Sequence, residues 1–224
     1  KNKSQKAIKL LEHRGPDYSN IFFTEKIAIG HTRLSILDLT DRSNQPFYDK
    51  NTDCYLAING EIINYKELAK KYSIDLESAG SDCKLVFQLF NRYGVRKIIN
   101  EMEGMFSGIY VDKKKNISII FRDRFGIKPI YYYITNDYFV AASEINAILP
   151  FIDKPSQEIN IVRDFIIDGN IDHSNKTFFA NIFQLSSGNL MEIDNFRNKI
   201  STIKWYEEIF EIEPSKFNYK EAKE

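Results

Sequence analysis

The sequence predicts an α+β domain whose strands and helices occupy separate layers. Segments with a β-like pattern occur in three runs, within residues 21–58, 105–142 and 182–206, and helical patterns fall between the runs, at 64–93 and 144–167. A helix after every strand would instead favour a doubly wound parallel sheet. The 224 residues are enough to bury a sizeable core in one large domain or two small ones.

The chain begins with an expected helix and three expected strands. Residues 3–12 carry apolar side chains at helical spacing, and the sequence His-Arg-Gly-Pro-Asp at 13–17 ends that pattern. Two short strands are expected between residues 21 and 39. A third is expected at 54–58, where Asn59-Gly60 ends it.

Two helices are expected next. Residues 64–72 predict a short helix capped by Asn64. Residues 82–93 predict a stronger one, with Ser81 or Asp82 available as its cap. The apolar stripe of this second helix consists of Leu85, Val86, Leu89 and Phe90.

The second half of the chain predicts mainly short strands, with short helices at 144–149 and 158–167. Residues 207–224 are charged and irregular and are typical of a linker. The expected strands lie near residues 105–111, 117–122, 130–134, 138–142, 182–184, 188–193 and 201–206.

Charge and composition argue against several function classes. The 31 basic and 31 acidic residues cancel, so no net field attracts nucleic acid or an anionic membrane. No apolar run approaches the ~20 residues of a membrane helix, and no cationic-then-apolar leader opens the chain. Cys54 and Cys83 have neither a metal-site spacing nor a disulfide framework, so we expect small core residues. These features predict a cytoplasmic protein without a metal site, whose partner is a small molecule or another protein.

A cation occurs in an otherwise largely apolar strand. Period-two alternation places Arg33 on the same face as His31 and Ser35, and the opposite face carries Leu34 and Ile36. A partly buried guanidinium needs an anion. An exposed strand face with a solvated arginine explains the pattern equally well, and the residues alone leave both interpretations open.

Two other short motifs also have two interpretations. Asn59-Gly60 is first of all a hairpin signal, but the following residues lead into a helix, which fits a hairpin poorly. A side-chain amide beside an unhindered glycine N–H can also form a pair of donors that stabilises an oxyanion. Gly80-Ser81-Asp82 by itself indicates only a helix cap.

Together these motifs resemble the glutamine amidotransferase domain of class II, of the asparagine synthetase type. The resemblance covers about residues 10–206, with the motifs in the family's order and spacing. It rests on His-Arg-Gly-Pro-Asp at 13–17, Gly-His-Thr-Arg-Leu-Ser-Ile at 30–36, Gln-Pro at 45–46, Asn-Gly-Glu-Ile-Ile-Asn-Tyr at 59–65, Gly-Ser-Asp at 80–82, Gly-Met-Phe at 104–106, Arg-Asp-Arg-Phe-Gly-Ile-Lys-Pro-Ile-Tyr-Tyr at 122–132 and Ala-Ser-Glu at 142–144.

The resemblance implies a four-layer αββα sandwich of the N-terminal-nucleophile hydrolase type that converts glutamine to glutamate and ammonia. Arg33 takes the position that grips the α-carboxylate of glutamine, a role suited to a bidentate fork. Asn59 and Gly60 match the oxyanion-hole pair, and Glu61 and Asp82 match the positions that hold the α-ammonium. The backbone groups expected to line the same pocket belong to Leu34, Ser35, Ile36 and Leu37.

The resemblance also implies parts that the sequence does not contain. The family's nucleophile is an N-terminal cysteine whose own α-amine is the base, whereas this chain opens at Lys1. We expect roughly fifteen preceding residues, including a first strand; the alternative is a degenerate domain that kept the pocket. Residues 1–206 then form the glutaminase domain, and 207–224 lead toward an absent C-terminal synthetase domain. That domain would bind ATP and Mg²⁺, whereas the glutaminase domain itself needs no cofactor.

The expected overall reaction is the conversion of aspartate to asparagine with glutamine as the nitrogen source. The alternatives are amide transfer to another acceptor, such as a sugar acid or carbohydrate precursor, and a catalytically dead glutamine-binding module. A homodimer is also compatible with the resemblance. We expect the charged turn with Arg122, Asp123, Arg124 and Lys128 to be an ion-paired scaffold or a domain interface. Ser143 and Glu144 resemble positions near the exit of ammonia, and a simple helix start explains them almost as well.

Overall fold

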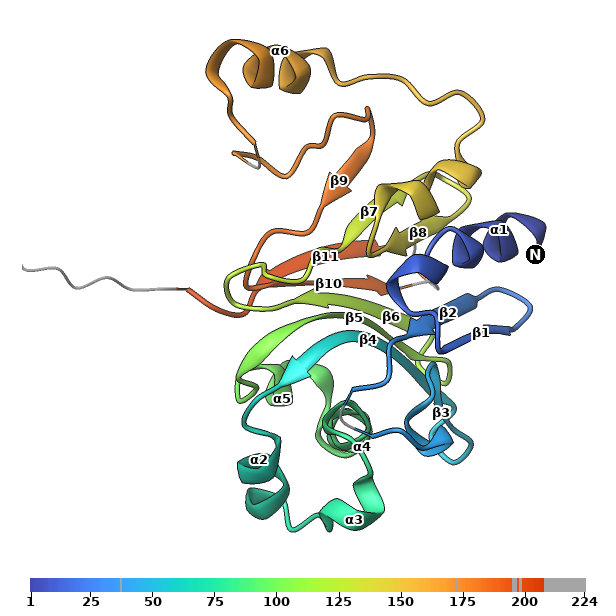
Figure 1. The fold of residues 1–224 in the computed structure, drawn as a ribbon, viewed down its shortest axis with the longest axis vertical. Coiled ribbons are helices and arrows are strands. Elements are labelled where there is room, and N and C mark those ends of the chain that lie inside the picture. The colour runs from blue at the N-terminus through green and yellow to red at the C-terminus, as the bar shows by residue number, and fades with distance from the viewer. Residues whose placement is uncertain (37, 172, 195–196, 198, 208–224) are drawn as a thin grey trace, which may run out of the picture.

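A computed structural model describes residues 1–36, 38–171, 173–194, 197 and 199–207. Two β layers lie face to face, and helices cover the outer side of each (Figure 1). The order of layers is therefore helix, sheet, sheet, helix, which confirms the predicted αββα arrangement.

The larger β layer is one antiparallel sheet in the order β11-β10-β6-β5-β4-β3. Its longest ladder joins β4 and β5, from Cys54 opposite Asp112 to Ile62 opposite Gly104. The strands are β3 (Phe47–Asp49), β4 (Cys54–Ile62), β5 (Gly104–Asp112), β6 (Ile117–Arg122), β10 (Asn189–Asp194) and β11 (Lys199–Lys204).

The smaller β layer consists of two separate antiparallel sheets. One pairs β1 (Tyr18–Phe23) with β2 (Ala28–Arg33). The other has the order β8-β7-β9 and contains β7 (Tyr131–Ile134), β8 (Phe139–Ala142) and β9 (Ile182–Gln184). No described strand pairs with the second edge of β2 or of β8.

Helices cover both outer faces (Figure 1). The six-stranded sheet is covered by α2 (Tyr65–Lys71), α4 (Asp82–Tyr93) and α5 (Val95–Ile99), with α3 (Leu76–Ala79) beyond them. The smaller layer is covered by α1 (Asn2–Lys9) and the short turns η3 (Ile145–Ala147) and η4 (Leu149–Phe151). The remaining elements are η1 (Glu12–Arg14), η2 (Asp41–Ser43) and α6 (Ile159–Asp168), which lies at the far end of the molecule from α3.

Alternation along the strands separates three apolar cores. Leu56 and Ile58 of β4 pack with the apolar stripe of α4 on the helical side of the large sheet. Tyr55 and Ala57 point the other way, into a small core with Ile29 between the β layers. A second inter-sheet core, under β7 and β9, contains Ile120, Ile130, Tyr132, Leu185, Met191 and Ile193.

Most predicted elements are present, and the structure corrects two details near the site. The strand expected to stop at 58 continues through Asn59-Gly60 to Ile62, because β5 pairs with it along its whole length. Asn64 precedes α2, as predicted, but makes no capping hydrogen bond. Its amide instead donates to the Glu101 carbonyl and accepts from the Glu103 N–H, at 2.8 and 3.0 Å.

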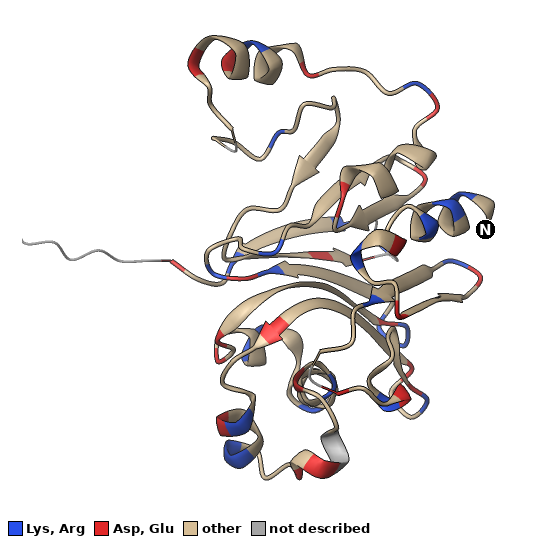
Figure 2. Cartoon of the chain, in the orientation of Figure 1, with Lys and Arg blue, Asp and Glu red and all other residues tan. Residues whose placement is uncertain are grey.

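The charged side chains are distributed without a large region of one sign. Lys and Arg alternate with Asp and Glu on the outer helices and loops, whereas the strands carry few charges (Figure 2). Within the described part of the chain, no helix combines the length and the apolar character that a membrane crossing requires. The expected linker, apart from Glu207, lies outside the described residues.

Candidate active site

The second half of β4 places Asn59 and Gly60 inside a continuous ladder, opposite Ser107 and Phe106 of β5. Gly60 has φ +155°, and a Cβ there would lie 2.6 Å from the Phe106 Cα and even closer to the Met105 carbonyl oxygen. Close approach of β5 therefore requires glycine at this position. The hairpin interpretation of Asn59-Gly60 is wrong.

Asn59 carries a buried donor that no described residue satisfies. Its Nδ2 atom has no hydrogen-bond partner among the described residues, although the atom is inaccessible to solvent. Buried amide donors almost always have an acceptor, so an unpaired one requires an explanation. Asn59 is also one of the residues that line a cavity of about 1230 Å³, although its Nδ2 itself is closed to solvent.

The cavity lies between the two β layers. Its floor includes Ala57 and Ile109 of the large sheet, and its sides include residues of β2 and β8, the two strands with an open edge. α1 closes the outer side, where Ile8 approaches Gly30 of β2. The gap between the sheets of the smaller layer therefore opens directly onto Asn59.

His31 of β2 also lines this cavity. Its Nε2 lies 3.2 Å from the Ile58 carbonyl oxygen, which makes Nε2 the protonated nitrogen. Burial lowers the pKa of His31 to about 4, against the opposing effect of the Ile58 carbonyl and with the help of the nearby Arg33 charge. The ring is therefore neutral near pH 7. Its Nδ1 is a buried acceptor without a partner among the described residues.

Arg33 is buried, with 8% of its surface exposed, which excludes the solvated interpretation. Its Nη1 donates to the Thr40 carbonyl and to Asn44 Oδ1, at 3.0 and 2.7 Å, and its Nη2 donates to the Asp38 carbonyl. No carboxylate of the described chain forms an ion pair with it. The guanidinium is therefore held in place by neutral acceptors and keeps its positive charge uncompensated.

The loop after β2 carries the four residues expected to line the substrate pocket. The Ser35 N–H donates to Asp17 Oδ2 at 2.7 Å, which anchors the start of the loop. The Leu34 and Ile36 side chains are 55% and 76% exposed, so any contribution from these positions comes from the backbone. Leu37 lies outside the described residues.

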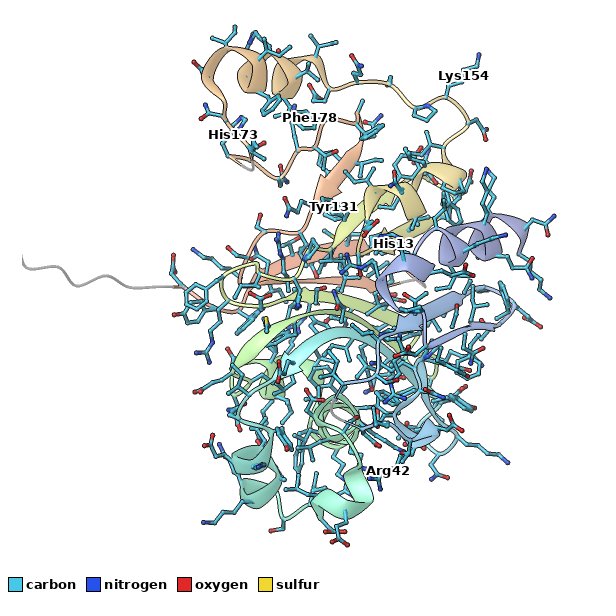
Figure 3. All side chains as sticks on the ribbon, in the orientation of Figure 1. His13, Arg42, Tyr131, Lys154, His173 and Phe178 are labelled. Carbon is cyan, nitrogen blue, oxygen red and sulfur yellow. The ribbon has the colours of Figure 1, made fainter. Side chains whose placement is uncertain are left out.

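Asp38 braces the same loop from below. Its carboxylate accepts hydrogen bonds from Ser43 Oγ at 2.6 Å and from the Thr40 N–H at 2.9 Å, and it pairs with Arg42 Nε at 3.0 Å. These bonds, with that from Ser43 the largest, hold the pKa of the Asp38 carboxyl well below its ordinary range. Arg42 continues the connection by donating to the Glu77 carbonyl of α3 at 2.9 Å (Figure 3). This network of bonds around Asp38 was not predicted from the sequence.

Asp82 and Glu61 lie near the end of β4. The Asp82 carboxylate is 4% exposed and accepts a hydrogen bond from the Ile62 N–H at 2.8 Å. It forms no ion pair with the described residues, and the more exposed Glu61 also forms none. Ser81, not Asp82, caps α4 through a 3.3 Å bond from the Lys84 N–H. The Asp82 carboxylate is therefore an uncompensated negative charge at the start of α4.

The charges of Asp82 and Arg33 both act on the thiol of Cys83. Burial, followed by the negative charge of Asp82, raises the pKa of the Cys83 thiol well above its ordinary value, while the Arg33 charge opposes this. Burial likewise raises the pKa of Cys54, whose sulfur accepts a 3.0 Å hydrogen bond from Tyr110 Oη. Both cysteines are buried neutral thiols, as predicted.

The charged turn after β6 is a scaffold held by main-chain groups. Arg122 donates to the carbonyls of Lys128 and Leu185 at 3.0 and 2.7 Å. The Asp123 carboxylate is fully buried and accepts four backbone N–H bonds, from Phe106, Phe125, Ile127 and Lys128, at 2.9–3.2 Å. An ion-paired scaffold or a domain interface was expected here, whereas the hydrogen bonds of Arg122 and Asp123 given above are all to backbone groups.

Glu144 links the start of η3 to the segment after α1. It pairs with Arg14 at 2.9 Å and with His13 at 3.0 Å, and His13 is visible beside the α1 end of the molecule (Figure 3). The contact between His13 and Glu144 was not predicted from the sequence. Ser143 lines the cavity. The described residues contain no group of three His, Cys, Asp or Glu side chains placed to hold a metal ion.

Comparison with known proteins identifies the family. A glutamine amidotransferase domain model matches residues 1–206. The chain is 32% identical over 201 residues to a glutamine-hydrolysing asparagine synthetase of Bacillus subtilis, covering 88% of this chain and 27% of that protein. It is 31% identical over 188 residues to the amidase chry2 of Gibberella zeae, covering 83% and 27%. The chain thus spans about a quarter of the length of these relatives.

A solved structure has the same fold. The glutamine phosphoribosylpyrophosphate amidotransferase of B. subtilis, complexed with ADP and GMP, matches 93% of this chain and 47% of that one, with a TM-score of 0.64 at 19% sequence identity. The αββα arrangement of this chain agrees with that structural match. The chain belongs to the class II glutamine amidotransferase family, whose fold is that of the N-terminal-nucleophile hydrolases.

Proposed function

We propose that this domain hydrolyses glutamine to glutamate and ammonia, with Asn59 and Gly60 as the oxyanion donors. The observation that carries the proposal is the buried Asn59 Nδ2, which has no acceptor among the described residues and belongs to a residue that lines the cavity. A tetrahedral oxyanion would supply that acceptor. One such donor is worth roughly 10²–10³ in kcat, or about 2.7–4 kcal/mol.

Two buried charges suit the other end of the substrate, although neither of them lines the cavity. Free glutamine is a zwitterion, so its recognition needs a cation for the carboxylate and an anion for the ammonium. Arg33 is a buried cation without a described carboxylate partner, and Asp82 is a buried anion without a described cation. Burying either charge is costly unless a partner is present for part of the working cycle. We assign Arg33 to the α-carboxylate and Asp82, with Glu61, to the α-ammonium.

The nucleophile is proposed to be an N-terminal cysteine on a strand that precedes the residues described. Neither buried neutral thiol of this chain is suited to attack. A strand between the open edges of β2 and β8 would unite the two sheets of the smaller layer and lie over Asn59. Neighbouring strands in a sheet lie about 4.8 Å apart. A strand that pairs with both β2 and β8 would therefore have to lie between these two edges, in the space that is now the cavity.

The chemistry then requires no cofactor within this domain. The α-amine of the cysteine takes the thiol proton while sulfur attacks the amide carbon of glutamine, and the oxygen becomes an oxyanion. Collapse breaks the C–N bond, the ammonium group returns the proton to the leaving nitrogen, and ammonia departs. Water then adds to the thioester and releases glutamate and the thiol.

The ammonia is proposed to pass to a C-terminal synthetase domain that makes asparagine from aspartate with ATP and Mg²⁺. Support comes from the similarity to an asparagine synthetase, which is far longer than this chain. The described part contains no candidate metal cluster, so we assign ATP and Mg²⁺ to no residue here. Transfer of the nitrogen to another acceptor is kept as a second candidate, because not every relative is named an asparagine synthetase and one is named an amidase.

The test uses the complete natural polypeptide. Glutamate and ammonia release are measured for the wild type, for replacement of its N-terminal cysteine by alanine, and for the double variant Cys54→Ala/Cys83→Ala. We expect the first change to abolish release and the double variant to keep it. Loss of release in the double variant alone would overturn the N-terminal thiol mechanism, and a wild type that binds glutamine without hydrolysing it would indicate a binding module.

A further inference from the structure

The Gln45 side chain bonds to the edge of β4 at a point where no described strand lies beside it. β3 pairs with β4 only as far as Phe47 opposite Leu56, so the β4 edge has no described strand neighbour beyond that point. The Gln45 side chain takes this place at Ile58. Its Oε1 accepts from the Ile58 N–H at 2.8 Å, and its Nε2 donates to the Ile58 carbonyl at 3.1 Å. Only 6% of Gln45 is exposed.

The two bonds reproduce what a neighbouring antiparallel strand would provide. A primary amide carries both a donor and an acceptor, and the orientation is unambiguous because the Ile58 N–H can only donate. The Ile58 carbonyl also accepts a bond from His31 Nε2 at 3.2 Å, so Ile58 is bound by side chains from β2 and from the segment before β3. The Ile58 carbonyl, which belongs to the peptide preceding Asn59, is therefore held by two side-chain nitrogens.

We propose that Gln45 is a positioning residue for the Asn59–Gly60 donor pair. This inference rests on the proposed glutaminase function. β5 holds one edge of β4 along its whole length, whereas on the other edge Gln45 is bonded to the residue immediately before Asn59. Electrostatic stabilisation of an oxyanion requires preorganised donors, and a misplacement of 1 Å can cost about 10²-fold in rate. Gln45 itself bonds to the backbone and needs no contact with substrate.

A positioning role and a purely stabilising role of Gln45 predict different kinetics. Loss of a stabilising contact lowers the melting temperature but leaves the folded enzyme equally active. Loss of positioning lowers kcat, because the donors are misaligned in the transition state, while KM for glutamine changes little. Within the described part of the chain, Gln45 forms no hydrogen bond with Arg33 or Asp82, the charged groups assigned to substrate binding.

The experiment compares Gln45→Met with Val95→Ala in the complete polypeptide. Methionine has a similar length but cannot form either bond. Val95 is buried in α5 on the helical side of the large sheet, so its truncation destabilises the fold away from the cavity. We expect Gln45→Met to lower glutaminase kcat by about tenfold to a hundredfold with KM changed less than about threefold. Val95→Ala should keep kcat within about twofold at a lowered melting temperature.

Hydrogen exchange supplies a readout that needs no activity. In Gln45→Met, a peptide covering residues 54–62 should exchange faster, whereas peptides from β10 should not. An unchanged kcat in the folded Gln45→Met variant would overturn the inference, whether or not residues 54–62 exchange faster. If Gln45→Met fails to fold, Gln45→Glu is used, which keeps an acceptor for the Ile58 N–H but loses the amide donor; an undiminished kcat in that variant would also overturn it.

Failure of the proposed function is distinguishable from failure of this inference. A wild type that released no ammonia would refute the proposed function. The exchange measurement would then decide by itself whether Gln45 holds β4: faster exchange at residues 54–62 would support it, and unchanged exchange would reject it.

Discussion

Replacement of Asn59 by aspartate separates catalysis from folding. The change keeps the size of the side chain and removes the amide donor. Nδ2 forms no hydrogen bond with the described residues, so its loss breaks no such bond. In the transition state the variant places carboxyl oxygens where a donor is needed. The new carboxyl is closed to solvent, so the structure predicts a large effect on rate and a loss of stability that protonation of the carboxyl limits.

The expected magnitude follows from the number of donors lost. Removal of one oxyanion donor costs about 10²–10³ in kcat, so we expect glutaminase kcat to fall at least about 100-fold. For a domain of this size 1 kcal/mol corresponds to about 2–4 °C, so the melting temperature measures the cost of burying the new carboxyl independently of kcat. Glutamine binding, which depends on Arg33 and Asp82 in our proposal, should persist.

The assay measures kcat, glutamine affinity and melting temperature side by side in the complete polypeptide. Asn189→Asp is the matched control, because Asn189 lies in β10 of the same sheet, away from Asn59. Its kcat should remain within about twofold of the wild type. An unchanged kcat in Asn59→Asp would remove Asn59 from the catalytic residues, and equal losses in both variants would show that the effect is not specific to the site.

Three further predictions test the other parts of the site. Arg33→Lys should raise KM for glutamine at least about tenfold, because a point charge replaces a planar fork, and should leave an ammonia-dependent reaction of the complete enzyme unchanged; an equal loss of both reactions would make Arg33 structural. Gly60→Ala should lower the melting temperature and kcat together, since its Cβ would meet the Phe106 Cα at 2.6 Å; an unaffected variant would contradict the close packing of β5. Burial lowers the pKa of His31 from 6.5 to about 4, so the unfolded chain binds more protons between these values and stability should fall as the pH drops from 6.5 toward 4, by at most about 3 kcal/mol. In denaturant titrations at pH 7.5 and 5, His31→Gln should lose less stability than the wild type, and equal losses would refute the assignment.

Local patterns predicted the elements that carry strong periodicity. The stripe of α4 predicted its bounds, 82–93, because amphipathic helices show their buried face directly in the sequence. The bounds of β5 and β6 were predicted to within one residue, because their apolar residues form short continuous segments. The short β3 strand and the helices α3 and α5 were not predicted, since segments of three to five residues carry too little periodic signal.

The candidate site was predicted through motifs, and its contacts were not. Arg33, Asn59 and Asp82 are distant in the sequence, and a pattern cannot show that the first and last are buried charges without described ion-pair partners. The motif Gln-Pro at 45–46 was recognised, but nothing local indicates that Gln45 bonds to Ile58, thirteen positions later. Such contacts depend on where separate segments meet.

Local patterns were enough to predict the layered α+β class and the residue types available for binding a zwitterion and an oxyanion. The conformation of Asn59-Gly60 depends instead on contacts between segments that are distant in the chain. Locally, Asn-Gly favours a turn by a small conformational preference, whereas nine consecutive pairings with β5 favour an extended strand and together outweigh it. The same pairing directs the Asn59 amide into the space between the β layers, where no described acceptor reaches it. Asn59 therefore lies in a strand and not in a turn. Hydrogen bonds to the neighbouring strand, and not the residues adjacent in the chain, set its conformation.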